Sequence, residues 1–145
     1  MKTKKQPKVL YLAVPYSHLC PLTRESRYQK ACYVASKLMR AGVIVFSPLS
    51  HSVPIAKYVG EVDDHEFWLG QDIPLLHRCD ELLMVALDGW HKSRGVRKEM
   101  YEAFALGKPI TIITEADIER LPAVPKNARR YFQSKILTET YDGNQ

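Results

Sequence analysis

Four short, almost continuous apolar runs alternate along this chain with stretches of helical periodicity, and this alternation narrows the possible folds more than any other feature. The runs are Val9 to Val14, Val43 to Phe46, Leu82 to Leu87 and Pro109 to Thr114. Each has the length and composition of a strand buried on both faces, as in a parallel sheet. Between the runs, apolar residues recur at helical spacing over Thr23 to Met39, His65 to Arg78 and Gly95 to Leu106. This order predicts an α/β fold of the Rossmann-like (flavodoxin-like) type, in which helices flank a parallel sheet on both faces.

The remaining segments complete the expected domain organisation. Ser47 to Gly60 is rich in Pro, Ser and His and is predicted to be a loop. Short helices are expected over Asp117 to Leu121 and Ala128 to Lys135. We therefore expect one domain over residues 8–140, preceded by a basic flexible tail over residues 1–7.

Charge and cysteine content exclude several classes of protein. The formal net charge is +5, but Lys2, Lys4, Lys5 and Lys8 supply most of it, so the rest of the 145-residue chain is nearly neutral. No specific nucleic-acid partner is expected. No apolar run approaches the length of a membrane span, and no apolar segment follows the basic start, so a cytoplasmic location is predicted. The three cysteines form no CxxC pair and are interpreted as structural thiols.

Glu99 lies beside the apolar stripe of the third predicted helix. That stripe consists of Val96, Met100, Ala103 and Phe104. A carboxylate here borders the sheet near the helix start, at the carboxyl end of a buried strand, where ligands bind in open α/β sheets. A first-turn acid that interacts with the helix dipole, or a simply exposed residue, explains Glu99 equally well.

Asp72 is placed more unusually, because apolar residues flank it three and four positions away on both sides. These residues are Trp68, Leu69, Leu75 and Leu76. Burial would raise the pKa of this carboxyl, which prepares a general acid for neutral pH. Pro74 offers another interpretation, in which the helix begins near Asp72 and uses it as the N-cap. From this residue alone, the capping interpretation is slightly favoured.

The loop Ser93-Arg94-Gly95 provides a hydroxyl, a cation and backbone N–H groups at a helix start. This combination suits an anion such as phosphate. Ser93 as a plain N-cap and Arg94 as a surface residue explain the loop equally well. Neither GxxxxGK[ST] nor GxGxxG is present, so the usual support for ATP or dinucleotide binding is missing.

Histidines and serines do not form a recognisable metal or nucleophile motif. The five histidines lack ligand spacing, and no serine lies in a GxSxG elbow. We expect neither a metal nor an organic cofactor. His51 could line a pocket at the same sheet edge, although a surface histidine is the simpler interpretation.

The spacing of several of these residues matches a known family. Tyr11 lies in the first strand, Asp72 precedes Asp80 by eight residues, and the helix that carries Glu99 ends at Gly107-Lys108-Pro109-Ile110. Over roughly Lys8 to Thr114 the chain resembles the nucleoside 2-deoxyribosyltransferase-like superfamily, especially its small phage and bacterial members of unassigned function.

The resemblance implies cleavage of the N-glycosidic bond between a nucleobase and a sugar. Glu99 would act on the anomeric carbon as nucleophile or electrostatic stabiliser, Tyr11 would hold Glu99, and Asp72 would contact the base and protonate the leaving nitrogen. It also implies a homo-oligomer, because family members commonly complete the site with residues of a neighbouring subunit.

The residue six positions before the glutamate separates branches of this superfamily. Transferases acting on free nucleosides tend to carry an acid at this position, whereas nucleoside monophosphate hydrolases carry a serine. This chain has a serine, Ser93. A carboxylate would repel a phosphate that a hydroxyl at a helix N-terminus would accept. Arg94, Arg97 and Ser17 are candidates to help bind the phosphate.

The loops near the expected pocket depart from the better-known members. Pro15-Tyr16-Ser17-His18 lacks the glycines that the monophosphate hydrolases use near the phosphate, and Gly89-Trp90-His91 lengthens the loop before Ser93. Tyr16 and Trp90 are candidates to stack on a base, as is Trp68, which is more simply a core residue.

Together these features predict an N-glycosidase that cleaves the base–sugar bond of a nucleoside 5′-monophosphate or nucleoside. The alternatives are a nucleoside deoxyribosyltransferase and a non-catalytic nucleotide-binding or regulatory module, since related folds host many functions.

Overall fold

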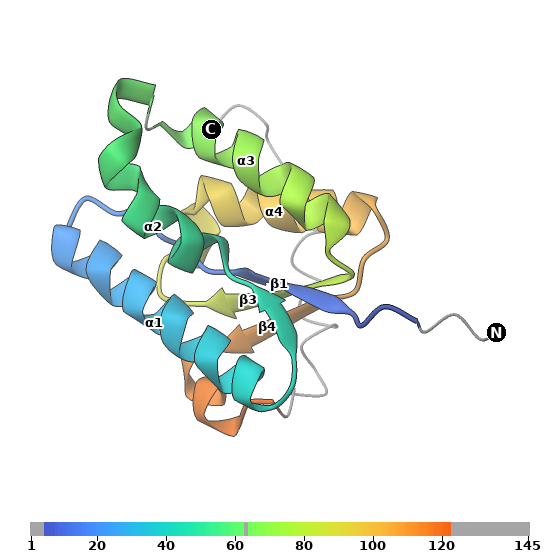
Figure 1. Cartoon of the computed structure of the whole chain (residues 1–145). Helices are drawn as coiled ribbons and strands as arrows, with labels where there is room; N and C mark the ends of the chain where they lie inside the picture. The colour runs from blue at the N-terminus through green and yellow to red at the C-terminus, as the bar shows by residue number, and fades with distance from the viewer. Residues whose placement is uncertain (1–4, 63, 123–145) are drawn as a thin grey trace.

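One parallel sheet lies at the centre of the molecule, between layers of helices (Figure 1). The computed structural model describes residues 5–62 and 64–122. Its strands are β1 (Val9–Ala13), β2 (Ile44–Phe46), β3 (Glu81–Ala86) and β4 (Ile110–Thr114). They are hydrogen-bonded in the order β2-β1-β3-β4, and all three pairings are parallel. Flavodoxin-like sheets begin in this order, so the predicted fold class is confirmed.

The helices follow the strands in the alternation expected from the sequence. They are α1 (Pro21–Arg40), α2 (Pro48–Val59), α3 (His65–Arg78) and α4 (Arg94–Ala105), with 3₁₀ turns η1 (Gly60–Val62), η2 (Trp90–Lys92) and η3 (Glu115–Arg120). The short C-terminal helix predicted over 117–121 is the 3₁₀ turn η3. The helix predicted over 128–135 and the end of the domain predicted at residue 140 lie outside the described residues.

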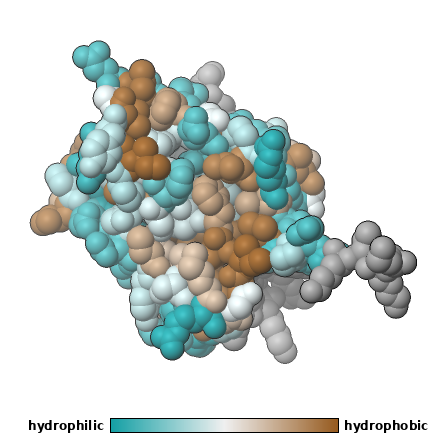
Figure 2. Space-filling view, viewed as in Figure 1, coloured by the Kyte–Doolittle hydropathy of each residue, from teal (hydrophilic) through white to brown (hydrophobic). Residues whose placement is uncertain are grey.

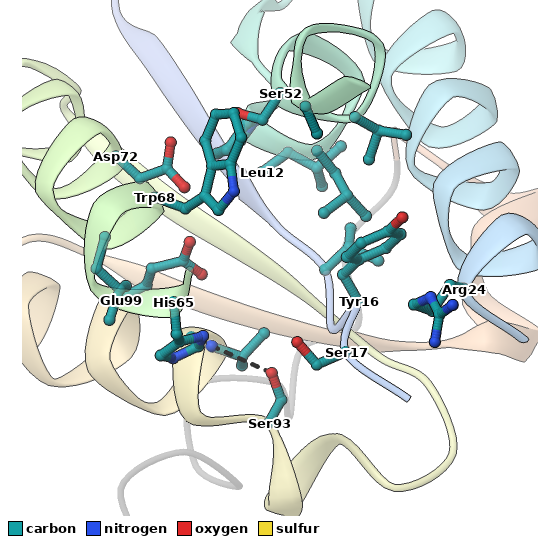
Figure 3. Close-up of a pocket in the computed structure, with 18 of the residues that line it drawn as sticks. Leu12, Tyr16, Ser17, Arg24, Ser52, His65, Trp68, Asp72, Ser93 and Glu99 are labelled. Carbon is teal, nitrogen blue, oxygen red and sulfur yellow. Dashed lines mark hydrogen bonds between the residues drawn. The ribbon is translucent and has the colours of Figure 1, made fainter. Parts of the chain in front are cut away.

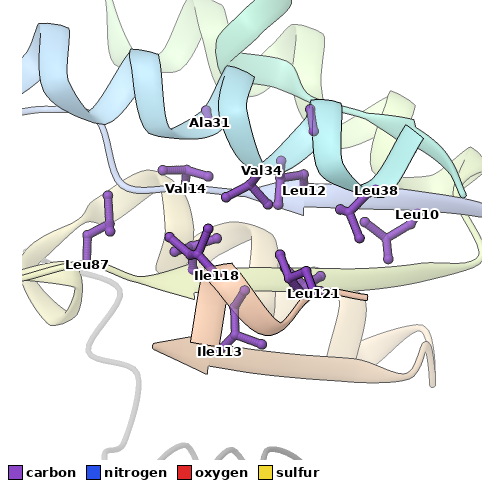
Figure 4. Packing of buried hydrophobic residues seen from close by; sticks show 13 residues of the cluster. Leu10, Leu12, Val14, Ala31, Val34, Leu38, Leu87, Ile113, Ile118 and Leu121 are labelled. Carbon is purple, nitrogen blue, oxygen red and sulfur yellow. The ribbon is translucent and has the colours of Figure 1, made fainter. Parts of the chain in front are cut away.

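Side chains of β1 alternate between two hydrophobic cores, one on each face of the sheet. Leu10, Leu12 and Val14 pack with α1 and η3 (Figure 4), whereas Tyr11 and Ala13 belong to the core under α3 and α4. Successive side chains of a strand point to opposite faces, so this division follows directly from the sequence. Burial of each leucine in these cores contributes about 1.5–3 kcal/mol. The alternation also places the phenol of Tyr11 on the same face as α4.

The prediction of a loop over Ser47 to Gly60 is wrong, because the helix α2 occupies Pro48–Val59. Pro48 stands at the first helical position, where a fixed φ and a missing N–H are no disadvantage. Leu49, Val53 and Ala56 then recur at helical spacing on the side that faces the interior of the molecule. The proline, serine and histidine content suggested a loop and obscured this pattern.

Two apolar residues of the predicted helical patterns are exposed. Phe104 in α4 is 46% exposed, so its assignment to the buried stripe is wrong, and Met39, at the end of the helical pattern of α1, is 56% exposed. Both lie at the outer edge of a stripe whose central residues, such as Ala35 and Met100, are buried. The period of 3.6 residues defines the centre of a helical face better than its edges.

None of the described helices combines the length and the apolar character needed to cross a bilayer. Figure 2 shows a mixed surface with local apolar groups, one of them at the outer end of α2, where Ile55 and Val62 are exposed. The three cysteines are free thiols.

Candidate active site

A cavity of about 380 Å³ opens beside the carboxyl end of β1, where α2, α3 and α4 converge (Figure 3). Its size falls within the range of small-molecule sites. β2 pairs with β1 only as far as Tyr11↔Phe46, so the last part of β1 faces the cavity. The wall consists of Leu12, Val14, Tyr16, Ser17, Arg24, Pro48, Leu49, Ser52, Val53, Ala56, Asp64, His65, Trp68, Leu69, Asp72, Ser93, Gly95, Val96 and Glu99.

A buried tyrosine–glutamate pair joins β1 to α4, and its glutamate lines this cavity. The phenol oxygen of Tyr11 donates a hydrogen bond of 2.7 Å to Oε1 of Glu99. Tyr11 is fully buried and Glu99 is 7% exposed. The interpretation of Glu99 as an exposed residue is therefore wrong, and its carboxyl is a buried group of the cavity wall.

Asp72 lies in the interior of α3, and its carboxyl faces the same cavity (Figure 3). The N-cap of α3 is Asp64, whose Oδ1 accepts a 2.7 Å hydrogen bond from the backbone N–H of Phe67. The helix then continues through Pro74 to Arg78. The interpretation of Asp72 as an N-cap is wrong, because a better-placed aspartate eight residues earlier has that role.

Burial dominates the electrostatics of the two carboxyls. It raises the pKa of Asp72 to about 6. It raises the pKa of Glu99 to about 8, against the opposing effect of the Tyr11 hydrogen bond, and the nearby Asp72 charge adds to the rise. The pKa of the Tyr11 phenol is raised well above its usual value, chiefly by burial and then by the Glu99 charge, so it remains a donor. Near neutral pH the two carboxyls therefore hold about one proton between them, and the higher pKa of Glu99 places it mainly on Glu99. A reaction with Glu99 as the nucleophile and Asp72 as the acid would start from the less populated form, in which Asp72 holds that proton.

The start of α4 forms another part of the cavity wall. Ser93 is its N-cap and is 8% exposed, and its Oγ accepts a 3.3 Å hydrogen bond from the backbone N–H of Val96. Ser93 and Gly95 line the cavity together with Tyr16 and Ser17 of the loop after β1. The structure thus brings these four predicted residues together.

Four predicted residues lie away from the cavity wall, and one of them is Arg97, which is partly buried on α4. Arg94 is exposed, and its Nη2 lies 2.5 Å from Oε1 of Glu66 in an ion pair. Trp90 is buried in the core under α4, and its ring stacks on His91 at 3.9 Å between centroids. His51 is exposed on α2, and its ring lies 5.9 Å from that of Phe46.

Several cavity residues were not predicted from the sequence. Arg24 of α1 and His65 of α3 both line the cavity, as does the hydroxyl-bearing Ser52 of α2. Nε2 of His65 is buried without a hydrogen-bond partner among the described residues, and burial lowers the pKa of this imidazole. A correct assignment of α2 would have indicated Ser52, which lies between Leu49 and Val53 on one helical face. Trp68, interpreted mainly as a core residue, is half-buried and lines the cavity beside Asp72.

The described side chains do not include a metal-binding cluster. Within residues 5–62 and 64–122, no three His, Cys, Asp or Glu side chains are grouped so that they could hold a metal ion.

Removal of the Tyr11 hydroxyl should weaken the function of the carboxyl pair. Because its hydrogen bond lowers the pKa of Glu99, Tyr11→Phe should raise that pKa further and leave less Glu99 ionised at pH 7. If the cavity catalyses the base release expected from the sequence, its kcat/KM should fall roughly 10- to 100-fold, the range for a lost hydrogen bond to a charged group. A pH–rate profile should show the alkaline limb at higher pH. Tyr33→Phe is the matched control, because Tyr33 also bonds a carboxylate, Glu119, but outside the cavity; an equal loss in both variants would contradict the assignment.

Comparison with solved structures shows the same fold in an enzyme. The chain matches a structure described under the characterisation of 2-deoxyribosyltransferase from the psychrotolerant bacterium Bacillus psychrosaccharolyticus, with a TM-score of 0.55 and 22% sequence identity. The match covers 73% of this chain and 72% of that chain. At this level of identity the likeness shows a shared fold, the 2-deoxyribosyltransferase-like arrangement.

Comparison with sequence families is more direct. No curated protein matches the chain. A family model matches residues 8–115, which include all four strands and every residue that lines the cavity. The chain therefore belongs to the family described as Domain of unknown function (DUF1937).

Proposed function

We propose that this protein is an N-glycosidase that hydrolyses the base–sugar bond of a nucleoside 5′-monophosphate or nucleoside. The observation that carries the proposal is the buried Tyr11–Glu99 hydrogen bond of 2.7 Å in a cavity that Asp72 also faces. Two carboxyls with raised pKa values in one small-molecule cavity are typical of acid–base and nucleophilic chemistry.

The proposed reaction uses the two carboxyls in turn. The Glu99 carboxylate attacks the anomeric carbon and forms an ester bond, while the bond from that carbon to the base nitrogen breaks. The electron pair of the broken bond goes to the base nitrogen, which takes a proton from Asp72. Water then attacks the same carbon, gives its proton to Asp72 and releases the sugar from Glu99. Tyr11 keeps the Glu99 carboxylate oriented, since its phenol donates to Oε1.

A second candidate function is deoxyribosyl transfer, in which an acceptor base replaces water in the second step. The fold likeness to a structure described as a 2-deoxyribosyltransferase favours it. The same glutamate and aspartate serve both reactions, so the two functions differ in which nucleophile reaches the glycosyl–Glu99 ester. A homo-oligomer, with a neighbour completing the site, remains a prediction.

The decisive experiment is a panel of ribo- and deoxyribonucleoside 5′-monophosphates and free nucleosides, with and without an added base, followed by chromatography. Release of free base from monophosphates would support the hydrolase proposal. Base exchange would favour the transferase. Absence of turnover on the whole panel would overturn both and leave a nucleotide-binding module.

Ser93 should influence the choice between phosphorylated and free substrates. In Ser93→Asp the new carboxylate would repel a phosphate at the start of α4, while aspartate remains a good N-cap and preserves the helix start. We expect the ratio of kcat/KM for a monophosphate to that for its nucleoside to fall roughly 10- to 100-fold, the effect of losing a charge-assisted contact. Ser93→Thr keeps a hydroxyl and should leave the ratio nearly unchanged. An unchanged ratio in Ser93→Asp would show that no phosphate binds there.

A further inference from the structure

The charges around the cavity are divided between its two sides. The acidic residues of the wall, Asp64, Asp72 and Glu99, all come from α3 and α4. Among the described residues, Arg24 of α1 is the only lysine or arginine in the wall. Figure 3 shows Arg24 beyond Tyr16 and Ser17, on the side opposite Asp72. A ligand that matches this division has an anionic group directed towards α1.

Among the described residues, carbonyl oxygens hold the Arg24 side chain and no carboxylate pairs with it. Its Nη1 donates to the carbonyl oxygen of His18 and lies 3.4 Å from that of Leu19. None of the ion pairs within residues 5–62 and 64–122 involves this guanidinium. Its remaining N–H donors and its full positive charge are available at the cavity wall, because guanidinium carries five donors.

A second arginine adds positive charge behind the same loop. Arg27, one helical turn after Arg24, is 7% exposed. Its Nη1 donates to the carbonyl of Ser17 at 2.8 Å, and its Nη2 donates to that of Asp88 at 2.8 Å. It too is absent from the ion pairs of the described residues. A buried cation held only by carbonyl dipoles is costly, and a nearby bound anion would offset that cost.

The two cations that the sequence indicated for this purpose, Arg94 and Arg97, do not line the cavity. Arg94 pairs with Glu66 outside the cavity wall. We propose that Arg24 is the residue that selects a substrate with a 5′-phosphate, by contacting that phosphate from α1. This inference rests on the proposed function and names the phosphorylated member of the substrate class. Arg27 donates to the carbonyl of Ser17 and so holds the loop after β1 in place. Arg24 contacts the carbonyls of the next two residues of that loop.

Steady-state kinetics with a nucleoside 5′-monophosphate and its free nucleoside test the role of Arg24. In Arg24→Gln, KM for the monophosphate should rise roughly 10- to 100-fold, the effect of a lost charge-assisted hydrogen bond, while kcat and the nucleoside values stay nearly unchanged. Arg24→Lys should give an intermediate rise, because it keeps the charge and loses the planar fork. Arg94→Gln is the matched control and should leave both substrates unaffected. Equal effects on both substrates, or equal effects in the Arg94 control, would overturn the proposal.

A binding measurement separates this inference from the proposed function. Calorimetry should show that the wild-type protein binds ribose 5-phosphate more tightly than ribose, and that Arg24→Gln loses this difference. The result does not require turnover, so it holds even if no base release is found. Equal affinity of the wild type for the two sugars would refute the phosphate role of Arg24, whatever the reaction. If Arg24→Gln does not fold, as judged by its melting temperature, Arg24→Lys should show a smaller preference for ribose 5-phosphate than the wild type, because lysine keeps the charge and loses the planar fork.

Discussion

Replacement of Glu99 by glutamine is expected to abolish base release and to stabilise the fold at alkaline pH. Glutamine has nearly the same shape, and its Oε1 can still accept the hydrogen bond from Tyr11. It cannot attack the anomeric carbon or stabilise positive charge there, so turnover should fall roughly 10³-fold or more, as for other lost nucleophiles. Measurement of base release by chromatography at several pH values checks the loss.

The stability gain follows from the raised pKa of Glu99. Its value is about 8 in the folded chain and near 4.5 in the unfolded chain. Between these values Glu99 binds more protons in the folded state than in the unfolded state. The contribution of Glu99 to the free energy of unfolding is therefore most favourable below pH 4.5, declines between pH 4.5 and pH 8, and stays low above pH 8. At about 1.4 kcal/mol per pKa unit, the decline reaches several kcal/mol above pH 9. Glutamine carries no charge and should remove this decline.

Chemical denaturation at pH 5 and at pH 9 measures the effect. Wild-type and Glu99→Gln proteins should have similar free energies of unfolding at pH 5, and the variant should be clearly more stable at pH 9. Glu102→Gln on the same helix is the control, because bonds to Lys98 and His77 lower the pKa of that carboxyl. It should lose stability slightly and keep full activity. A Glu99→Gln protein no more stable than wild type at pH 9 would show that Glu99 is not a strained buried carboxyl.

The sheet could be predicted from the sequence because its signal is local. The composition of an apolar run such as Val9 to Val14 is enough to predict a strand that is buried on both faces. Because successive side chains of a strand alternate between faces, Tyr11 is then expected on the face of the sheet opposite to that of Leu10 and Leu12. The helix that carries Glu99 was predicted for the same reason. Helix α2 was missed because its prolines and serines resemble loop composition, although Leu49, Val53 and Ala56 follow a helical period.

The roles of the arginines could not be predicted, since they depend on contacts between distant segments. Arg94 is adjacent to Ser93 in sequence, but an ion pair with Glu66, 28 residues away, holds its side chain outside the cavity wall. Arg24 had no motif around it, and it reaches the wall only because α1 begins directly after the loop that leaves β1. Asp72 was ambiguous for a similar reason, because Asp64 had first to be recognised as the N-cap of α3.

Replacement of Asp72 by asparagine is expected to slow base release and to change its pH dependence. Loss of a general acid costs roughly 10²- to 10⁴-fold in rate. The loss should be smaller for a substrate whose base leaves without needing a proton, such as a nucleotide of 7-methylguanine. Comparison of the two substrates in the variant therefore tests whether Asp72 supplies a proton or only contacts the base.

The pH profile gives a second, independent measure of the role of Asp72. In the wild type, kcat/KM should be bell-shaped with limbs near pH 6 and pH 8, because activity needs one proton shared between Asp72 and Glu99. With asparagine at position 72, only the ionisation of Glu99 remains, so the profile should rise with pH to a plateau. This single limb should lie below pH 8, since the Asp72 charge that raises the pKa of Glu99 is gone. Asp80 lies at the amino ends of β1 and β3, away from the cavity, where its Oδ2 accepts a hydrogen bond from the backbone N–H of Val9, so Asp80→Asn should keep the bell. Persistence of the bell in Asp72→Asn would assign the second ionisation to another group.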